Sequence, residues 1–487
     1  MREVEPLTRE QLIVLLGAAP VELAAALLAP LIAADDLPTA RLALIAAEHA
    51  APVGLVPALL KAIDRRGLRS HAAAVLRRIG EPGLTLIIER LLAVDTPLDV
   101  RVALTRVCGA IGGQRAATAL ADLLARPGVL GRTALRALVR MRGHSEVVVD
   151  EALVGQFIEQ TIDLLYRDLL QLERGSWPLA RVALADLPLF ERALGEHVDR
   201  LIWRLFALLS LRYPVADLRA AFDGLRSPLR SIRSSSIELL DNILPKPLSG
   251  RVTPLLEEAD ARHFSEAIDY DLPAEERVRE RALARALEST DRWLQAVACW
   301  SVDASTSVAL APLLRRLAEQ QADLELARVA QRALAGQKEN HGMPMTVVEK
   351  ALKLQTVDVL QRATTEDLAQ VAQIAQEVEL DSGTKLYDEG DAPDALFVVV
   401  SGQVKLLRSN SEIGTATAGE AFGTWALFDE APRLASAQTE GQTTLLRVDR
   451  EDFLELLADR SDLAQAVFRA MVGRVRQLAD LVQGDPG

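Results

Sequence analysis

Arg433 and the residues before it have the types and spacing needed to bind a phosphate group. A phosphate with two exocyclic oxygens and one negative charge is matched by a delocalised cation with fork geometry, which a guanidinium provides. Gly423 allows the backbone to approach a ligand closely. Free N–H groups at the start of a helical turn at 424–428 would add hydrogen-bond donors and a favourable dipole. The pattern therefore predicts an anion site within residues 423–433.

The segment that carries this site consists of short strands between helical regions. From about Gln376 to Asp449, apolar residues alternate with a period of two and are interrupted by glycines, as at Ser401-Gly402. About eight short strands with no room for a second sheet favour a roll or barrel. Helices are expected on both sides of the strands, over 348–375, 451–458 and 462–483.

The chain before residue 336 contains an internal repeat. Arg69 and Arg101 are 32 positions apart, and Ile79-Gly80 recurs as Ile111-Gly112 at the same spacing. Each unit is predicted to be two helices, of which the first ends at a glycine C-cap and the second has one apolar face. Two helices cannot bury both apolar faces alone, whereas stacked neighbours can. The repeat therefore predicts an array of helix pairs.

Composition and charge exclude several classes of protein. The formal net charge is −13, which argues against a non-specific nucleic-acid binder. Cys108 and Cys299 are far apart, no CxxC occurs and the histidines are scattered, so we expect no disulfide, no metal site and a cytoplasmic location. The apolar stretch 12–34 contains a glutamate and two prolines, which favours packed helices over a membrane span.

Motifs typical of enzymes are missing from the sequence. We find no HExxH, no GxSxG, no kinase glycine loop and no GxxxxGK[ST] phosphate loop. The expectation is a protein that is not an enzyme and has no catalytic residues.

The order of motifs over 346–487 resembles a cyclic nucleotide-binding domain. The motifs are Gly390-Asp391, the strand pair at 396–404, Gly419-Glu420-x-Phe422-Gly423 and Pro432-Arg433. The resemblance implies an α+β domain with a β-roll or jelly-roll core, a ligand such as cAMP or cGMP, and no other cofactor. It also implies that the amides of Ala426 and Leu434 face the phosphate. The ligand contacts that follow from it are Phe422, Gly423, Thr424, Ala426, Arg433 and Leu434.

Thr424 departs from the family pattern. Nucleotide-binding members usually have Glu at this position, whose carboxylate accepts a hydrogen bond from the ribose 2′-OH, and Glu420 belongs to the preceding turn instead. A hydroxyl in place of the carboxylate forfeits a charge-assisted hydrogen bond of about 1.5–3 kcal/mol. Two interpretations stay open: a nucleotide site, and a degenerate fold in which Arg433 pairs with Asp429 or Glu430.

The last expected helix carries an apolar stripe at helical spacing. In the family this helix lies over the base, so Phe468 or Met471 could cap a bound nucleotide. Packing on the roll and dimerisation explain the stripe equally well. Its members are Val467, Phe468, Met471, Val475 and Leu478.

The repeats resemble HEAT-type repeats, most clearly over 37–143. We therefore expect a HEAT-like α-helical solenoid over 1–336, a linker over 337–345 and the cyclic nucleotide-binding-like domain over 346–487. This order resembles the soluble tail of bacterial fusion proteins that begin with a nucleotide-carrier-like membrane domain. The sequence ends soon after the last helix, so a winged helix-turn-helix for DNA is not expected.

Two functions fit these expectations. In the first, a bacterial regulatory protein senses a cyclic nucleotide and transmits its occupancy across the linker to a solenoid that binds a protein partner. In the second, the C-terminal fold is degenerate and the chain is a scaffold for protein–protein interaction without a ligand.

Overall fold

The computed structural model describes residues 20–65, 67–126, 128–144, 147–170, 184–264, 272–320, 323–336, 343–409, 411–429 and 431–483. Two compact units divide the chain. The first comprises Met1–Val182 and His197–Glu275, and the second comprises Ala183–Glu196 and Glu276–Gly487. This division does not follow the expected domain boundary at 336, which was defined by sequence motifs and stays a prediction.

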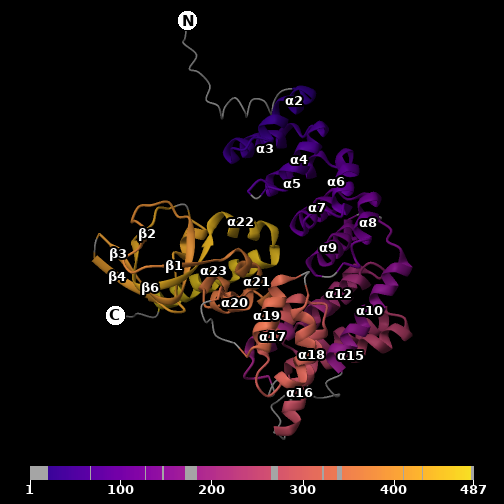
Figure 1. Cartoon of the computed structure of the whole chain (residues 1–487). Helices are drawn as coiled ribbons and strands as arrows, with labels where there is room; N and C mark the ends of the chain where they lie inside the picture. Colours follow the sequence, from indigo (N-terminus) through magenta and orange to yellow (C-terminus); the bar gives the residue numbers. More distant parts are fainter. Residues whose placement is uncertain are drawn as a thin grey trace. The chain divides into compact units, whose positions relative to one another are not determined.

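The first unit is built of helices (Figure 1). Their bounds are α2 Val21–Ile32, α3 Leu37–Ala50, η1 Val53–Leu55, α4 Val56–Ala62, α5 Arg69–Ile79, η2 Glu81–Gly83, α6 Leu84–Leu92, α7 Leu98–Ile111, α8 Gly113–Ala121, α9 Gly128–His144, α10 Glu151–Leu170, α13 Val215–Leu225, α14 Arg230–Ile243 and α15 Lys246–Phe264. Helices α12 (Pro188–Leu209) and α16 (Leu272–Glu288) have residues in both units.

Successive helix pairs of the first unit pack in two rows. Helices α3, α5, α7 and α9 contact one another in order, and α4, α6 and α8 form the second row. The expected glycine caps are confirmed, because Gly80 and Gly112 follow α5 and α7 with φ of 72° and 80°. The assignment of these pairs to HEAT-type repeats in a solenoid remains a prediction.

In three helices, α5, α7 and α14, an arginine holds the helix to the segment before it. The Arg69 Nε donates to the Ile63 carbonyl, and the Arg101 Nη2 donates to the Ala93 carbonyl. Arg233 donates in the same way to the Ser227 carbonyl. A guanidinium satisfies carbonyls that have no partner at the end of a helix. Arg69 also forms a 2.7 Å ion pair with Asp99 of the next pair.

The second unit combines helices with one six-stranded antiparallel sheet (Figure 1). Its helices are α17 Arg292–Ser301, α18 Ser307–Ala318, α19 Leu324–Leu334, α20 Val347–Leu354, η3 Asp358–Leu360, α21 Thr365–Ile374, η4 Thr424–Leu427, α22 Arg450–Asp459 and α23 Ser461–Gln483. Its strands are β1 Gln376–Leu380, β2 Lys385–Tyr387, β3 Ala395–Arg408, β4 Ser411–Thr417, β5 Ala421–Phe422 and β6 Ser436–Asp449.

The sheet order is β1-β6-β3-β4, with β2 on β6 and β5 on β3. The expectation of about eight short strands is wrong, because β3 and β6 are each continuous over 14 residues. The expected break at Ser401-Gly402 is a shift of register within β3, where Gly402 has a φ of 82°. Such an irregularity bends a strand without ending it.

The core of the β domain contains three aromatic rings. Phe397 and Phe422 stack with their ring centroids 5.3 Å apart, and Tyr387 packs on both rings. The buried members of this core are Ala395, Phe397, Val399, Val404, Ala416, Phe422, Ala437 and Leu445. This arrangement confirms a mostly helical N-terminal region followed by an antiparallel β domain.

Two further expectations concern a membrane span and the linker. Within them, no helix combines the length and the apolarity needed to cross a membrane. Of the expected linker, residues 337–342 lie outside the described part of the chain. Pro344 and Met345 are anchored, because the Met345 amide donates to Glu377 and the Met345 and Pro344 carbonyls accept from Arg328 and Arg332.

Candidate functional site

Gly423 begins the expected anion site with a backbone conformation that only glycine adopts readily. Its φ is 72°, and it connects β5 to the 3₁₀ turn η4. A Cβ atom at this position would lie 2.6 Å from Nη1 of Arg433, closer than real contacts allow. Two independent features therefore require glycine here, the positive φ and the guanidinium against its Cα.

Arg433 is buried and already hydrogen-bonded. Its side chain is 5% exposed, and its Nη2 donates to Asp394 Oδ1 at 2.8 Å and to the Ala395 carbonyl at 2.7 Å. The guanidinium carbon lies 4.1 Å from the centroid of the Tyr387 ring, a cation–π arrangement. Burial raises the pKa of Tyr387, which keeps that ring neutral. The partner of Arg433 is thus Asp394 rather than Asp429, and Glu430 lies outside the described residues.

Asp394 links two arginines. Its second oxygen accepts from Arg447 at 3.1 Å, and Arg447 also contacts Asp449 at 2.7 Å. The backbone around Arg433 is fixed as well, because its amide donates to the Asp391 carbonyl and its carbonyl accepts from Gly390. Gly390-Asp391, noted in the sequence as a motif, therefore serves to hold Arg433 in place.

The Arg433 Nε atom is buried and has no hydrogen-bond partner within the described part of the chain. A buried donor without a partner costs free energy. The Nε atom thus keeps its donor capacity, and Nη1 is the nitrogen that lies against Gly423. Gly423 directly precedes η4, where the sequence predicted the phosphate.

The η4 turn contributes less than the sequence suggested. It contains four residues, and its Ala426 amide donates to the Gly423 carbonyl at 3.0 Å. In this conformation a phosphate would have to displace that hydrogen bond to reach the Ala426 amide. One short turn also adds little dipole. Leu434 and Trp425 flank the site with side chains 72% and 58% exposed.

Thr424 and Glu420 lie on separate turns. Thr424 is half-buried at the start of η4, next to Gly423. The Glu420 carboxylate accepts from the Thr417 amide at 2.7 Å and from its hydroxyl at 3.0 Å, and these hydrogen bonds lower the pKa of Glu420. Glu420 therefore holds its own turn and does not replace the missing glutamate.

The apolar stripe of α23 divides between two sides of the helix. Val467 is buried, whereas Phe468 and Val475 are 67% and 65% exposed. Met471 is half-buried, and the side chain of Leu478 lies outside the described part of the chain. Phe468 therefore does not pack in the core of this unit. A contact of Phe468 with the base of a bound nucleotide, or a role in dimerisation, stays a prediction.

Asp394 and Tyr387 were not anticipated from the sequence. A buried arginine requires a carboxylate partner, so a search for Asp or Glu next to a buried strand could have indicated Asp394. Tyr387 could have been found as an aromatic residue of an otherwise polar segment. Nothing in the local pattern identifies which of several such residues contacts Arg433.

The comparisons with known proteins agree with this geometry. Residues 377–460 match the cyclic nucleotide-binding domain family. A "cAMP-dependent protein kinase regulatory subunit" of Yarrowia lipolytica is 31% identical over 23% of this chain and 30% of its own length. A "CRP-like cAMP-activated global transcriptional regulator" of Mycobacterium tuberculosis is 28% identical over 25% of this chain and 58% of its own.

A solved structure, the N-terminal domain of a transcriptional regulator from Streptomyces coelicolor A3(2), is 30% identical. It covers 26% of this chain and 95% of its own, with a TM-score of 0.26. The chain spans about a third to somewhat over half the length of the two curated relatives. The chain contains a cyclic nucleotide-binding domain in its C-terminal part, as the motifs predicted.

Proposed function

We propose that this protein is a non-enzymatic, cytoplasmic regulator whose C-terminal domain binds a cyclic nucleotide, cAMP or cGMP, and transmits occupancy to its helical repeats. One observation carries the proposal: Arg433 is held with its Nη1 against Gly423, the residue that precedes the η4 turn, and its buried Nε has no hydrogen-bond partner within the described residues. A cyclic phosphate supplies an anion of the charge that a guanidinium binds. The buried free cysteines Cys108 and Cys299 fit a reducing compartment.

A packed route leads from the η4 turn to the helices before residue 336. The Phe428 ring, at the end of η4, meets the Phe453 ring of α22 edge-on at 5.9 Å. From the C-terminal end of α22, Arg460 lies 3.8 Å from Glu366 and 3.7 Å from Asp367 of α21. Packed elements of this kind can carry a displacement over a distance.

Thr365, at the first position of α21, connects this route to two helices. Its hydroxyl accepts from Trp293 Nε1 of α17 at 2.9 Å and donates to Glu196 Oε2 of α12 at 2.6 Å. Its amide donates to the same Glu196 carboxylate at 2.8 Å. Thr365 is fully buried and Trp293 nearly so. We call these three residues the Thr365 joint.

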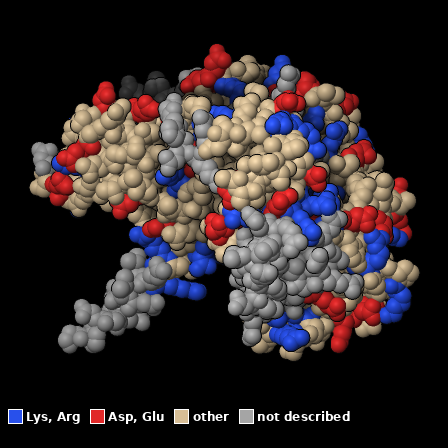
Figure 2. Space-filling model, turned by 60° about the horizontal axis from the view of Figure 1, so that its bottom comes forward, with Lys and Arg blue, Asp and Glu red and all other residues tan. Residues whose placement is uncertain are grey.

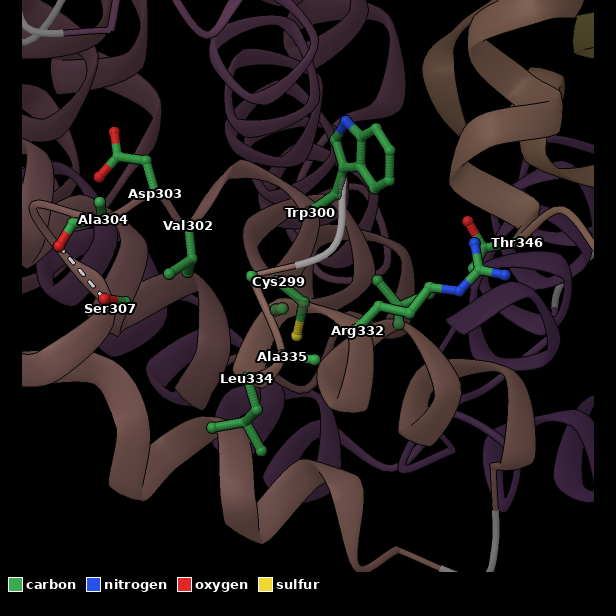
Figure 3. Close-up of a pocket in the computed structure, with 13 residues that line it drawn as sticks. Cys299, Trp300, Val302, Asp303, Ala304, Ser307, Arg332, Leu334, Ala335 and Thr346 are labelled. Carbon is green, nitrogen blue, oxygen red and sulfur yellow. Dashed lines mark hydrogen bonds between the residues drawn. The ribbon is translucent and has the colours of Figure 1, made fainter. Parts of the chain in front are cut away.

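A second buried contact holds α20 to α19. Arg332 Nη1 lies 2.6 Å from Glu349 Oε2, and the same oxygen accepts from the Thr346 amide and hydroxyl in a capping box. Figure 3 shows the Arg332 side chain extending toward Thr346. Both residues line a cavity of about 500 Å³. These contacts support transmission from the nucleotide domain to α17 and α19.

Calorimetric titration of the full chain with cAMP, cGMP and cyclic dinucleotides tests the sensor. The Arg433→Lys variant keeps the charge and loses the fork, so binding should weaken by about tenfold or more. Its melting temperature, compared with that of the parent, shows whether it is folded. Amide hydrogen exchange in 292–301 and 324–334 should change when the nucleotide saturates the domain.

The alternative function is a scaffold with a degenerate domain. Two features favour it. Thr424 lacks the carboxylate expected to accept from the ribose, and the Asp394 carboxylate competes with a phosphate for Arg433. If no nucleotide binds the folded chain, the scaffold replaces the sensor. If binding occurs without a change in exchange at α17 and α19, the transmission is refuted while the sensor stands.

A further inference from the structure

A groove in the first unit is formed by α9, α12 and α13. Its volume is about 330 Å³, and two of the residues that line it, Phe206 and Phe222, have ring centroids 5.1 Å apart. We call its apolar lining the floor of the groove; the other members are Val139, Trp203, Ala207, Val215 and Leu218. This volume is at the lower end of the range found for ligand-binding pockets. It can hold one or two large side chains but not an extended cofactor.

The charged residues of the groove are all basic. Arg136 and Arg140 from α9 and Arg219 from α13 line it, together with His144, and no Asp or Glu of the described residues does. All four side chains are exposed. The Arg136 guanidinium lies 5.0 Å from the Trp203 ring centroid, which places a cation directly above the apolar floor.

This local charge contrasts with the rest of the chain. The formal net charge is −13, and on the face drawn in Figure 2 basic and acidic side chains are interspersed. The carboxylates of α13, Asp217 and Asp223, are exposed but do not line the groove. Three arginines around an apolar floor select for a ligand with carboxylates around a large apolar side chain.

We propose that this groove is the docking site for an acidic amphipathic segment of a partner protein. One or two large apolar side chains of the segment fill the space over Phe206 and Phe222, and its carboxylates pair with Arg136, Arg140 and Arg219. The inference deepens the proposed function, on which it rests, by giving the helical repeats a binding surface and a partner chemistry. A nucleic acid is disfavoured because the overall negative charge repels a long polyanion and the floor is apolar.

The test uses a fluorescein-labelled helical peptide with Leu and Phe at helical spacing and Glu at its other exposed positions. Anisotropy is measured on the full chain without cyclic nucleotide. Peptides with Lys in place of Glu, and with Ala in place of the apolar residues, are the ligand controls. We expect only the acidic amphipathic peptide to bind, with affinity that falls as salt is added.

Variants of the groove separate its charge from its floor. Reversal of two charges of the groove, Arg140→Glu with Arg219→Glu, should lower the affinity for the peptide by about tenfold or more. Reversal of the charges of the exposed Arg77 and Arg78 on α5, outside the groove, should leave that affinity unchanged. Val139→Trp should block the peptide by filling the groove. Circular dichroism confirms that each variant is folded.

Several outcomes would overturn the proposal. They are equal binding of the Lys peptide, an unchanged affinity in the double Arg variant, no binding of the acidic peptide, and displacement of that peptide by a short single-stranded oligonucleotide. The assay contains no cyclic nucleotide, so the two proposals are tested separately. If the chain binds the peptide but no nucleotide, the docking site stands and the sensor function is refuted. If it binds a nucleotide but not the peptide, only the docking site is refuted.

Discussion

Gly423 and Arg433 are in direct contact, because the guanidinium occupies the space that a Cβ atom would take at position 423. The nine residues between them contain η4. This contact couples the conformation of the turn to the position of the cation, so a change in either affects both.

Gly423→Ala should destabilise the second unit. The substitution adds strain at a φ of 72° and drives a methyl group into Arg433, so the free energy of unfolding should fall by about 1–3 kcal/mol. Chemical denaturation measures it. Gly414→Ala is the matched control, because nothing lies within 4 Å of its added Cβ. Equal stability of the two variants would contradict the described contact.

Thr424→Glu should create or tighten cyclic nucleotide binding. A carboxylate at the start of η4 restores the acceptor for the ribose 2′-OH, and a charge-assisted hydrogen bond of about 1.5–3 kcal/mol corresponds to one to two decades in affinity. Calorimetry on the full chain measures the change, with Thr424→Gln as the uncharged control. Unchanged affinity in a folded Thr424→Glu variant would count against a nucleotide site and in favour of the scaffold.

Thr365→Val should loosen the Thr365 joint. The valine has nearly the same shape but leaves the buried Trp293 N–H without its acceptor, which costs about 1–3 kcal/mol. Trp293 should become more accessible to a fluorescence quencher, and amide exchange in α17 should rise. The exposed Thr356, mutated to Val, is the control. An unaltered exchange pattern in the Thr365 variant would show that the joint does not hold α17.

Asp168→Asn should remove part of the acid sensitivity of the first unit. Burial raises the pKa of Asp168, but hydrogen bonds and charge from His197 and Arg167 outweigh it, so the net pKa is below its ordinary value of 3.8. A carboxyl group whose pKa is lower in the folded state than in the unfolded state stabilises the folded state at pH values above its unfolded-state pKa. This contribution is lost as the pH falls through the folded-state pKa. The variant should therefore be less stable at neutral pH.

The difference between the parent and Asp168→Asn should shrink as the pH falls below about 3.8, and urea unfolding at several pH values measures it. Asp163→Asn is the control, because Asp163 forms only an exposed pair with Arg251, and exposed pairs contribute about 0–1 kcal/mol. A pH-independent difference would show that the Asp168 charge is not involved.

Features with a local cause could be predicted from the sequence. Gly80 and Gly112 end helices because a positive φ follows the last turn, and this requirement involves only neighbouring residues. The strand pattern and the order of motifs likewise identified the C-terminal domain, which the match over 377–460 confirms.

Features that depend on distant residues could not be predicted. Asp394 is 39 positions before Arg433, and several other carboxylates were equally plausible partners until the sheet brought these two together. The break expected at Gly402 is a shift of register, because a glycine in a strand pattern indicates either an end or a bulge. One local feature was also missed, because the expected role of the Ala426 amide did not account for its hydrogen bond to the Gly423 carbonyl three positions earlier.

The arginine contacts of the helical unit have a consequence for synthesis of the chain. Arg69, Arg101 and Arg233 each donate to a carbonyl only six to eight positions earlier, and successive helices pack on near neighbours. Contacts that close such short loops form quickly and need no later part of the polypeptide. The first helix pairs can therefore assemble on the ribosome while the nucleotide-binding domain is still untranslated.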